Sequence, residues 1–146
     1  MDITKLKDEL AIDEGIKHEV YLDHLNYPTF GIGHLVLKSD PEYGVEVGTK
    51  VTDERVTEAF EKDVQSVLVD CCSLHDDFYL LPEEAQLVIA NMMFNMGLTR
   101  LSKFKKFNAA VAKGDWTEAA VQMKDSAWYR QVTNRAERLI KRVAAL

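Results

Sequence analysis

The first apolar positions of the chain recur at helical spacing, and they are Ile3, Leu6 and Leu10. Residues three and four apart lie on one face of a helix, so this spacing predicts a helix with a buried side. Asp2 is a residue type that caps helix starts, and Gly15 supplies the left-handed conformation that commonly ends a helix. The pattern predicts that Glu14 is the last residue of this helix.

The next stretch changes from helical spacing to the composition of strands. Residues 19–35, EVYLDHLNYPTFGIGHL, are rich in β-branched and aromatic side chains, and asparagine, proline and two glycines interrupt them. This composition predicts a small antiparallel sheet with a turn near residues 24–28. The pattern weakens over residues 36–50, where SDPEYG indicates a turn.

A long amphipathic helix is predicted after that turn. Thr52 can cap its start, and Val51 and Val56 have the spacing of a hydrophobic staple. Residues at helical spacing then form the stripe that we expect to be buried, namely Val56, Phe60, Val64, Leu68 and Cys71.

Three further helices are predicted in the second half of the chain. Pro82 opens PEEAQLVIANMMFNMG, which is apolar nearly all round, closes at Gly97 and is expected to run through the core. The sequence DWTE, after Gly114, fits a capping box. The last segment, NRAERLIKRVAAL, places Ala136, Leu139, Ile140 and Val143 on one face, with Arg135, Arg138 and Arg142 outside it. The chain therefore reads as a small β lobe followed by a helical lobe.

Composition places the chain among soluble globular proteins. Its 146 residues fit one domain, and 47% are hydrophobic and 29% charged. No apolar run approaches the roughly 20 residues that span a bilayer, and the N-terminus lacks the apolar core of a secretory signal. The net charge of −6 opposes attraction to nucleic acid or anionic lipid. We therefore expect no membrane insertion, no signal peptide and no nucleic-acid partner.

The cysteines and histidines do not predict a metal site. Cys71 and Cys72 are adjacent, so a disulfide between them would be strained, and reduced thiols on a helix are expected. The four histidines lack the spacing of metal ligands, and they are His18, His24, His34 and His75. The sequence predicts no metal and no cofactor.

Glu14 is the first candidate for chemistry. A glutamate at a helix C-terminus lies at the negative end of the helix dipole, and Asp13 precedes it; both features favour its protonated form. A protonated carboxyl group is what a general acid requires. The alternative interpretation is a solvated helix-end glutamate, which is the common case for this residue type.

Asp23 and Thr29 become candidates if the hairpin folds back over the end of the first helix. Two carboxyl groups across a cleft are the minimum equipment for glycoside hydrolysis. A threonine hydroxyl that points into the cleft could hold a water beside Asp23. By spacing alone, Asp23 fits a turn residue that accepts from backbone amides, and Thr29 fits a strand residue.

Gly31, Gly33 and His34 follow in the same stretch. The glycines indicate a bulge or a place where a polymer passes close to the backbone. His34 fits a packed histidine, and Asp63 on the long helix could keep it charged and join sheet to helix.

Seven segments in the same order resemble the T-even bacteriophage type of lysozyme: DEG, YLD, PTFGIGHL, FEKDV, NMMFNMG, WTEAA and SAWYRQVTNRAER. The resemblance covers about residues 6–143. It implies a hydrolase that cuts peptidoglycan between N-acetylmuramic acid and N-acetylglucosamine with inversion. By this resemblance Glu14 is the general acid, Asp23 orients the attacking water and Thr29 assists it.

The resemblance also assigns supporting residues. It implies that His34 and Asp63 form a structural ion pair and that Arg135 lies beside the catalytic acid. The positions that contact sugar are, by the same resemblance, Leu35, Phe94 and Asn95.

The implied fold is α+β and mostly helical, with an active-site cleft between two lobes of one domain over residues 1–146. A β-containing lobe of about residues 15–51 is joined by a long helix, about 52–73. The helical lobe comprises about residues 74–146 and the N-terminal helix. The partner is the peptidoglycan glycan strand, and a monomer is expected.

Two other functions stay open from the sequence. A lytic transglycosylase would need the acid but no water, and a wall-binding homologue would need no turnover. The setting implied for a lysozyme is synthesis in the host cytoplasm, followed by action on the periplasmic wall after release. A virion-associated wall-degrading role is the alternative setting.

Overall fold

The computed structural model describes residues 1–146, and its contacts divide them into two units. The N-terminal unit comprises Ile3–Ser66, and the C-terminal unit comprises Met1–Asp2 with Val67–Leu146. The boundary falls within a single helix, which contributes residues to both units. The predicted lobe bounds and the single domain over residues 1–146 stay predictions.

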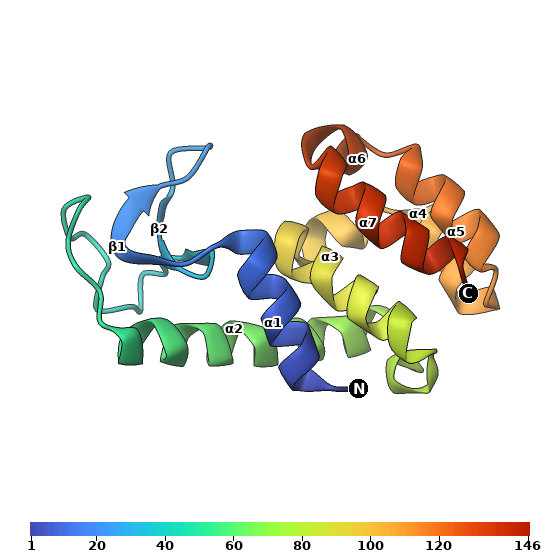
Figure 1. The fold of residues 1–146 in the computed structure, drawn as a ribbon, viewed down its shortest axis with the longest axis horizontal. Coiled ribbons are helices and arrows are strands. Elements are labelled where there is room, and N and C mark those ends of the chain that lie inside the picture. Colours follow the sequence, from blue (N-terminus) through green and yellow to red (C-terminus); the bar gives the residue numbers. More distant parts are fainter. The chain divides into compact units, whose positions relative to one another are not determined.

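The N-terminal unit contains a helix, a small sheet and the start of a second, long helix (Figure 1). The three strands are antiparallel and follow the order β1-β2-β3. The predicted hairpin and the predicted helix end at Glu14 are both confirmed, and Gly15 follows that end with a φ of +73°. The elements are α1 (Ile3–Glu14), β1 (Lys17–Leu22), β2 (Pro28–Gly31), β3 (His34–Leu35) and α2 (Asp53–Leu74).

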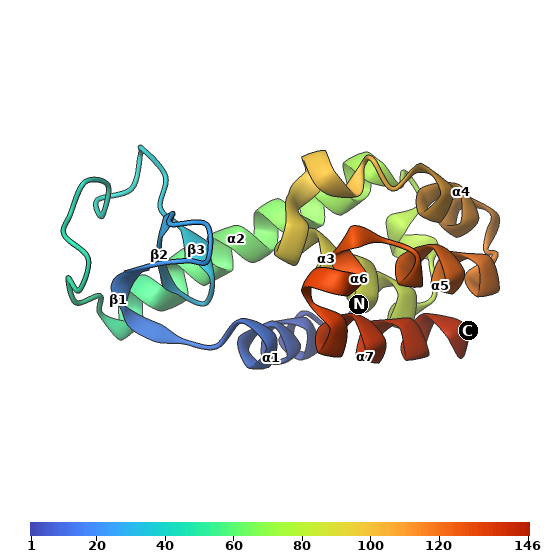
Figure 2. The same ribbon diagram turned by 90° about the horizontal axis from the view of Figure 1, so that it is seen from above.

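The C-terminal unit is helical. After a short 3₁₀ turn, η1 (Phe78–Leu80), its last helix contacts three of the others (Figures 1 and 2). The helices are α3 (Glu83–Leu101), α4 (Lys105–Lys113), α5 (Trp116–Lys124), α6 (Ala127–Gln131) and α7 (Thr133–Ala144), and α7 packs on α3, α5 and α6. The prediction of a mostly helical α+β chain is confirmed. No helix combines the length and the apolar character needed to cross a membrane.

The long helix α2 forms for the reasons that its sequence indicates. The Thr52 hydroxyl accepts a hydrogen bond from the Arg55 amide at 3.2 Å, which satisfies one of the free donors at the helix start. The predicted stripe from Val56 to Cys71 is buried. Cys71 and Cys72 are free thiols, as expected.

Two predictions about the helices of the C-terminal unit need correction. Gly97 interrupts the helix, as predicted, because its φ of +81° and ψ of 164° are not helical, but a second helical segment follows directly, so α3 extends to Leu101. Arg135 does not lie outside the buried face of α7, because it is 8% exposed and donates from Nε to Asn91 Oδ1 at 2.8 Å. The predicted cap of α5 is confirmed, since the Asp115 side chain accepts from the Glu118 amide.

Candidate active site

The end of α1 places the Glu14 carboxyl against the backbone of Gly33. A methyl group added at Gly33 would lie 2.7 Å from Glu14 Oε1, closer than carbon and oxygen approach without a shift. Gly33 also has a φ of +63°, a conformation that side chains beyond glycine rarely adopt. The positive φ therefore favours glycine at this position, and an added methyl group would displace the carboxyl group of the candidate acid.

Gly31 ends β2 and Gly33 lies in the turn that follows, and each is close to a side chain of another element. A methyl group at Gly31 would lie 3.2 Å from Val56 on α2, so Gly31 permits close packing of strand on helix, as Gly33 does for Glu14. Gly31 pairs with Lys17 at the edge of an irregular register that extends to Tyr21, so the bulge lies in β1 opposite this stretch, and the passage of a polymer close to the backbone stays a prediction.

Asp23 and Thr29 bind the same residue of the hairpin turn, Tyr27. Asp23 Oδ1 accepts from the amides of Leu25 and Tyr27 at 2.8 and 2.9 Å. The Tyr27 carbonyl accepts from the Asp23 amide at 3.0 Å and from Thr29 Oγ1 at 2.9 Å. The turn function predicted for Asp23 is thus confirmed, and the same bonds hold the two candidate side chains on either side of one residue, Tyr27.

These bonds determine which atoms of the pair can bind water. Both amides of the turn are bound by Oδ1 of Asp23, so Oδ2 is the oxygen that can accept from a water. The Thr29 hydroxyl donates its only proton to Tyr27, so towards a water it can act only as an acceptor. The pair offers two acceptors and no donor.

Tyr21 is a neighbour of both carboxylates that the sequence did not single out. Burial raises the pKa of its phenol, and the negative charges of Glu14 and then Asp23 raise that pKa further. In the sheet Tyr21 pairs with Thr29, and the ammonium group of Lys17 lies 4.2 Å from the centre of its ring. A neutral phenol is therefore present beside the candidate residues, able to donate a hydrogen bond. Its only signal in the sequence was its place two residues before Asp23.

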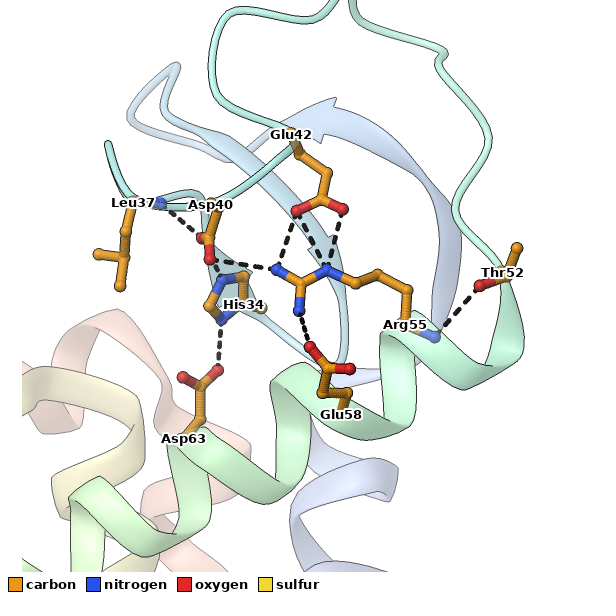
Figure 3. Close-up of polar contacts among 8 residues, drawn as sticks. All are labelled: His34, Leu37, Asp40, Glu42, Thr52, Arg55, Glu58 and Asp63. Carbon is orange, nitrogen blue, oxygen red and sulfur yellow. Dashed lines mark hydrogen bonds and ion pairs between the residues drawn. The ribbon is translucent and has the colours of Figure 1, made fainter.

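His34 lies between two carboxylates (Figure 3). Its Nδ1 is 2.7 Å from Asp63 Oδ2, which is the predicted pair, and its Nε2 is 2.7 Å from Asp40 Oδ2. Because carboxylate oxygens only accept, both ring nitrogens must donate, which requires the doubly protonated ring. Burial alone would lower the pKa of His34, but the hydrogen bonds to Asp63 and Asp40 outweigh it and raise that pKa.

The second carboxylate belongs to a larger group of charges that the sequence analysis missed. Arg55 Nη2 donates to Asp40 at 3.1 Å, and Arg55 Nε donates to Glu42 at 2.9 Å. No periodic pattern could have revealed these contacts, because they join a turn to a helix across 13 to 15 positions. We call this group the His34–Arg55 cluster, and its members are His34, Asp40, Glu42, Arg55, Glu58 and Asp63.

The predicted sugar contacts lie in both units. Leu35 follows His34 in the N-terminal unit and is 47% exposed. In the C-terminal unit Phe94 is half-buried, and Asn95 Oδ1 accepts from Trp128 Nε1 at 2.7 Å. The roles assigned to these residues and to Arg135 stay predictions.

Comparison with known proteins gives a consistent result. A family model described as "Phage lysozyme" matches residues 11–145. "Probable T4-type lysozyme 2" of Dictyostelium discoideum is 33% identical over 158 residues, which cover 94% of this chain and 92% of that protein. "Pre-baseplate central spike protein Gp5" of Enterobacteria phage T4 is 31% identical over 92% of this chain and 26% of its own length. "Peptidoglycan hydrolase gp36" of Pseudomonas phage phiKMV is 29% identical over 98% of this chain and 15% of its own length.

Proposed function

Because this chain belongs to the phage lysozyme family and is a glycoside hydrolase that acts on peptidoglycan, we propose that it cleaves by inversion at the β-1,4 bond between N-acetylmuramic acid and N-acetylglucosamine. The observation that supports this proposal most strongly is the arrangement of three side chains in the N-terminal unit. Glu14 lies on Gly33, while Asp23 and Thr29 bind Tyr27 and offer two acceptors for one water.

Glu14 is the general acid of the proposed reaction. Its carboxyl proton passes to the glycosidic oxygen as the bond to the anomeric carbon of the muramic acid breaks. The contact with Gly33 limits where the carboxyl group can turn, which supports a fixed direction of proton transfer.

Asp23 and Thr29 hold the attacking water. A water that donates one proton to Asp23 Oδ2 and the other to Thr29 Oγ1 keeps a lone pair for the anomeric carbon. As this oxygen forms its bond, Asp23 accepts a proton, and the sugar leaves on the opposite face with the proton from Glu14. The product has the inverted α configuration.

The proposal extends to the substrate and the setting. Leu35, Phe94 and Asn95 are assigned to sugar contact; the exposure of Leu35 supports its assignment. The similarity to a spike protein supports a virion-associated role as one setting, and release at lysis is the other. We expect a monomer, and sedimentation velocity measures its oligomeric state. We also expect no nucleic-acid partner, because the net charge of −6 opposes binding to nucleic acid.

The test uses two isosteric variants and purified sacculi. Glu14→Gln removes the proton donor, and Asp23→Asn keeps an oxygen for the amides of Leu25 and Tyr27 but removes the charge. Both variants should abolish clearing of the sacculi while circular dichroism stays that of the parent chain. Clearing by Glu14→Gln at the parent rate would reject the assigned acid, and the absence of clearing by the parent chain would favour a wall-binding homologue.

A further inference from the structure

Residues 36–50 form most of the connection between β3 and α2, and hydrogen bonds at both ends tie this segment to the sheet. At its start the Val36 amide donates to the Pro28 carbonyl at 2.9 Å. At its end the Gly48 amide donates to the Val20 carbonyl at 2.7 Å. Between these ends the apolar side chains do not anchor it, because they are between 37% and 59% exposed, and they are Leu37, Tyr43, Val45 and Val47.

Charged groups hold the middle of the segment. Asp40, whose side chain is 12% exposed, accepts from three donors: the Leu37 amide, His34 Nε2 and Arg55 Nη2. The hydrogen bonds from Leu37 and His34 keep the pKa of Asp40 below its usual value despite burial, so the carboxylate is ionised. This one side chain therefore fixes the turn, the first residue of β3 and the first turns of α2 relative to one another.

Arg55 occupies the centre of the cluster (Figure 3). Its Nε and Nη2 both donate to Glu42 at 2.9 Å, a two-bond geometry that fixes the plane of the guanidinium group. That group also lies 5.4 Å from the centre of the Phe30 ring, and Phe30 is fully buried in β2. Arg55 thus joins the segment to the sheet as well as to its own helix.

The cluster ends next to the candidate acid. His34, bound by Asp40 and Asp63, directly follows Gly33, whose backbone contacts the Glu14 carboxyl. A movement of His34 would shift Gly33, and the surface against which Glu14 rests would move with it.

We propose that Asp40 and Arg55 are positioning residues for the hydrolysis: through His34 they hold Gly33 against the Glu14 carboxyl so that its proton faces the glycosidic oxygen. This inference rests on the proposed function. It concerns residues that never touch the substrate, and it predicts a loss in kcat larger than any change in KM, because the geometry of proton transfer changes while sugar contacts remain.

The charges around His34 allow the role of geometry to be separated from that of charge. Asp63 faces the His34 ring from α2, and Asp40 faces it from the segment. The centre of the Phe30 ring lies 4.9 Å from the centre of the His34 ring. Arg55 acts on His34 through its hydrogen bond to Asp40. Removing the negative charge of Asp40 should lower the pKa of His34. Removing the positive charge of Arg55 should raise it.

The experiment measures kcat and KM on soluble, uncross-linked peptidoglycan strands, with His34 titrated by proton NMR. The variants are Asp40→Asn and Arg55→Gln, with Arg55→Lys as a conservative variant that keeps the charge. Glu58→Gln is the matched control, because Glu58 also binds Arg55, but its side chain is 72% exposed on α2, where solvent screens its charge. At a pH below the His34 pKa that proton NMR finds in each variant, both Asp40→Asn and Arg55→Gln should lower kcat about tenfold.

Three further results are expected. The pKa of His34 moves in opposite directions in the two variants, and the alkaline limit of kcat moves with it. Arg55→Lys restores part of kcat, and Glu58→Gln has the kcat of the parent chain. The inference is overturned if the first two variants, folded by circular dichroism, retain kcat within about twofold. If the parent chain releases no reducing ends, the proposed function itself fails, which is a different result from an active parent with unaffected variants.

Discussion

The contact between Gly33 and Glu14 predicts the effect of adding a single methyl group. In Gly33→Ala the new carbon would lie 2.7 Å from Glu14 Oε1, whereas ordinary contact begins near 3.4 Å. The oxygen must therefore retreat by about 0.7 Å. Because a misplacement of about 1 Å can cost on the order of a hundredfold in rate, kcat should fall between about tenfold and a hundredfold.

The substitution also strains the backbone, so its effect on stability has to be measured separately. Alanine at a φ of +63° costs about 1–2 kcal/mol. Gly114→Ala is the matched control, because Gly114 has a φ of +70° and no atom lies within 4 Å of the added methyl group. Both variants should lose about 1–2 kcal/mol of unfolding free energy in urea titrations.

Only Gly33→Ala should lose activity on soluble peptidoglycan strands. The assay compares kcat of the two variants under conditions where both are folded, so that the shared loss of stability cancels. Equal kcat values would show that the Gly33 backbone does not determine the position of the Glu14 carboxyl, and they would refute the reasoning.

Three further predictions concern stability and reactivity. Because the pKa of His34 is raised on folding, its contribution to stability is complete below the unfolded pKa near 6.5 and is lost as the pH rises through the folded pKa. Urea titrations between about pH 6 and about pH 10 should show a loss of about 1.4 kcal/mol of unfolding free energy for each unit by which the folded pKa exceeds the unfolded one. His34→Asn should remove this pH dependence. Burial raises the pKa of Cys71 to about 12, so iodoacetamide at about pH 8 should modify Cys72 well before Cys71. Peptide mass spectrometry measures the two rates, and equal rates would contradict the burial of Cys71. Leu10→Ala, at a fully buried position in α1, should lower the unfolding free energy by about 2–5 kcal/mol. Ile12→Ala, at a position 80% exposed on the same helix, should change it by less than about 0.5 kcal/mol. Similar losses in the two variants would contradict the packing of α1.

The elements that the sequence predicted have local signals. The helix end at Glu14 and the start of α2 at Thr52 depend on residues within one turn of each boundary. In contrast, α4 was not predicted, since its N-cap is Phe104 and no side chain caps it. The sequence predicted that Arg135 lies outside the apolar face, because arginine is rarely buried without a partner. Its partner, Asn91, lies on another helix and could not be identified from the sequence.

In the candidate site, too, a contact between residues close in the sequence was predicted, and two contacts between distant residues were not. Asp23 and its turn amides lie within four residues, and residue type alone predicted that contact. The contact of Glu14 with Gly33 joins residues 19 positions apart, and Asp40 meets Arg55 across 15 positions. Such pairs depend on how the chain folds back, which hydrophobic spacing and turn composition do not specify.

The most direct test of the proposed mechanism is the anomeric configuration of the first product. Proton NMR of soluble peptidoglycan strands, recorded before mutarotation, distinguishes the two anomers of the new N-acetylmuramic acid end. A water held by Asp23 and Thr29 opposite the leaving sugar should give the α anomer first. A first product with the β anomer, or with a 1,6-anhydro end, would contradict the roles assigned to Asp23 and Thr29.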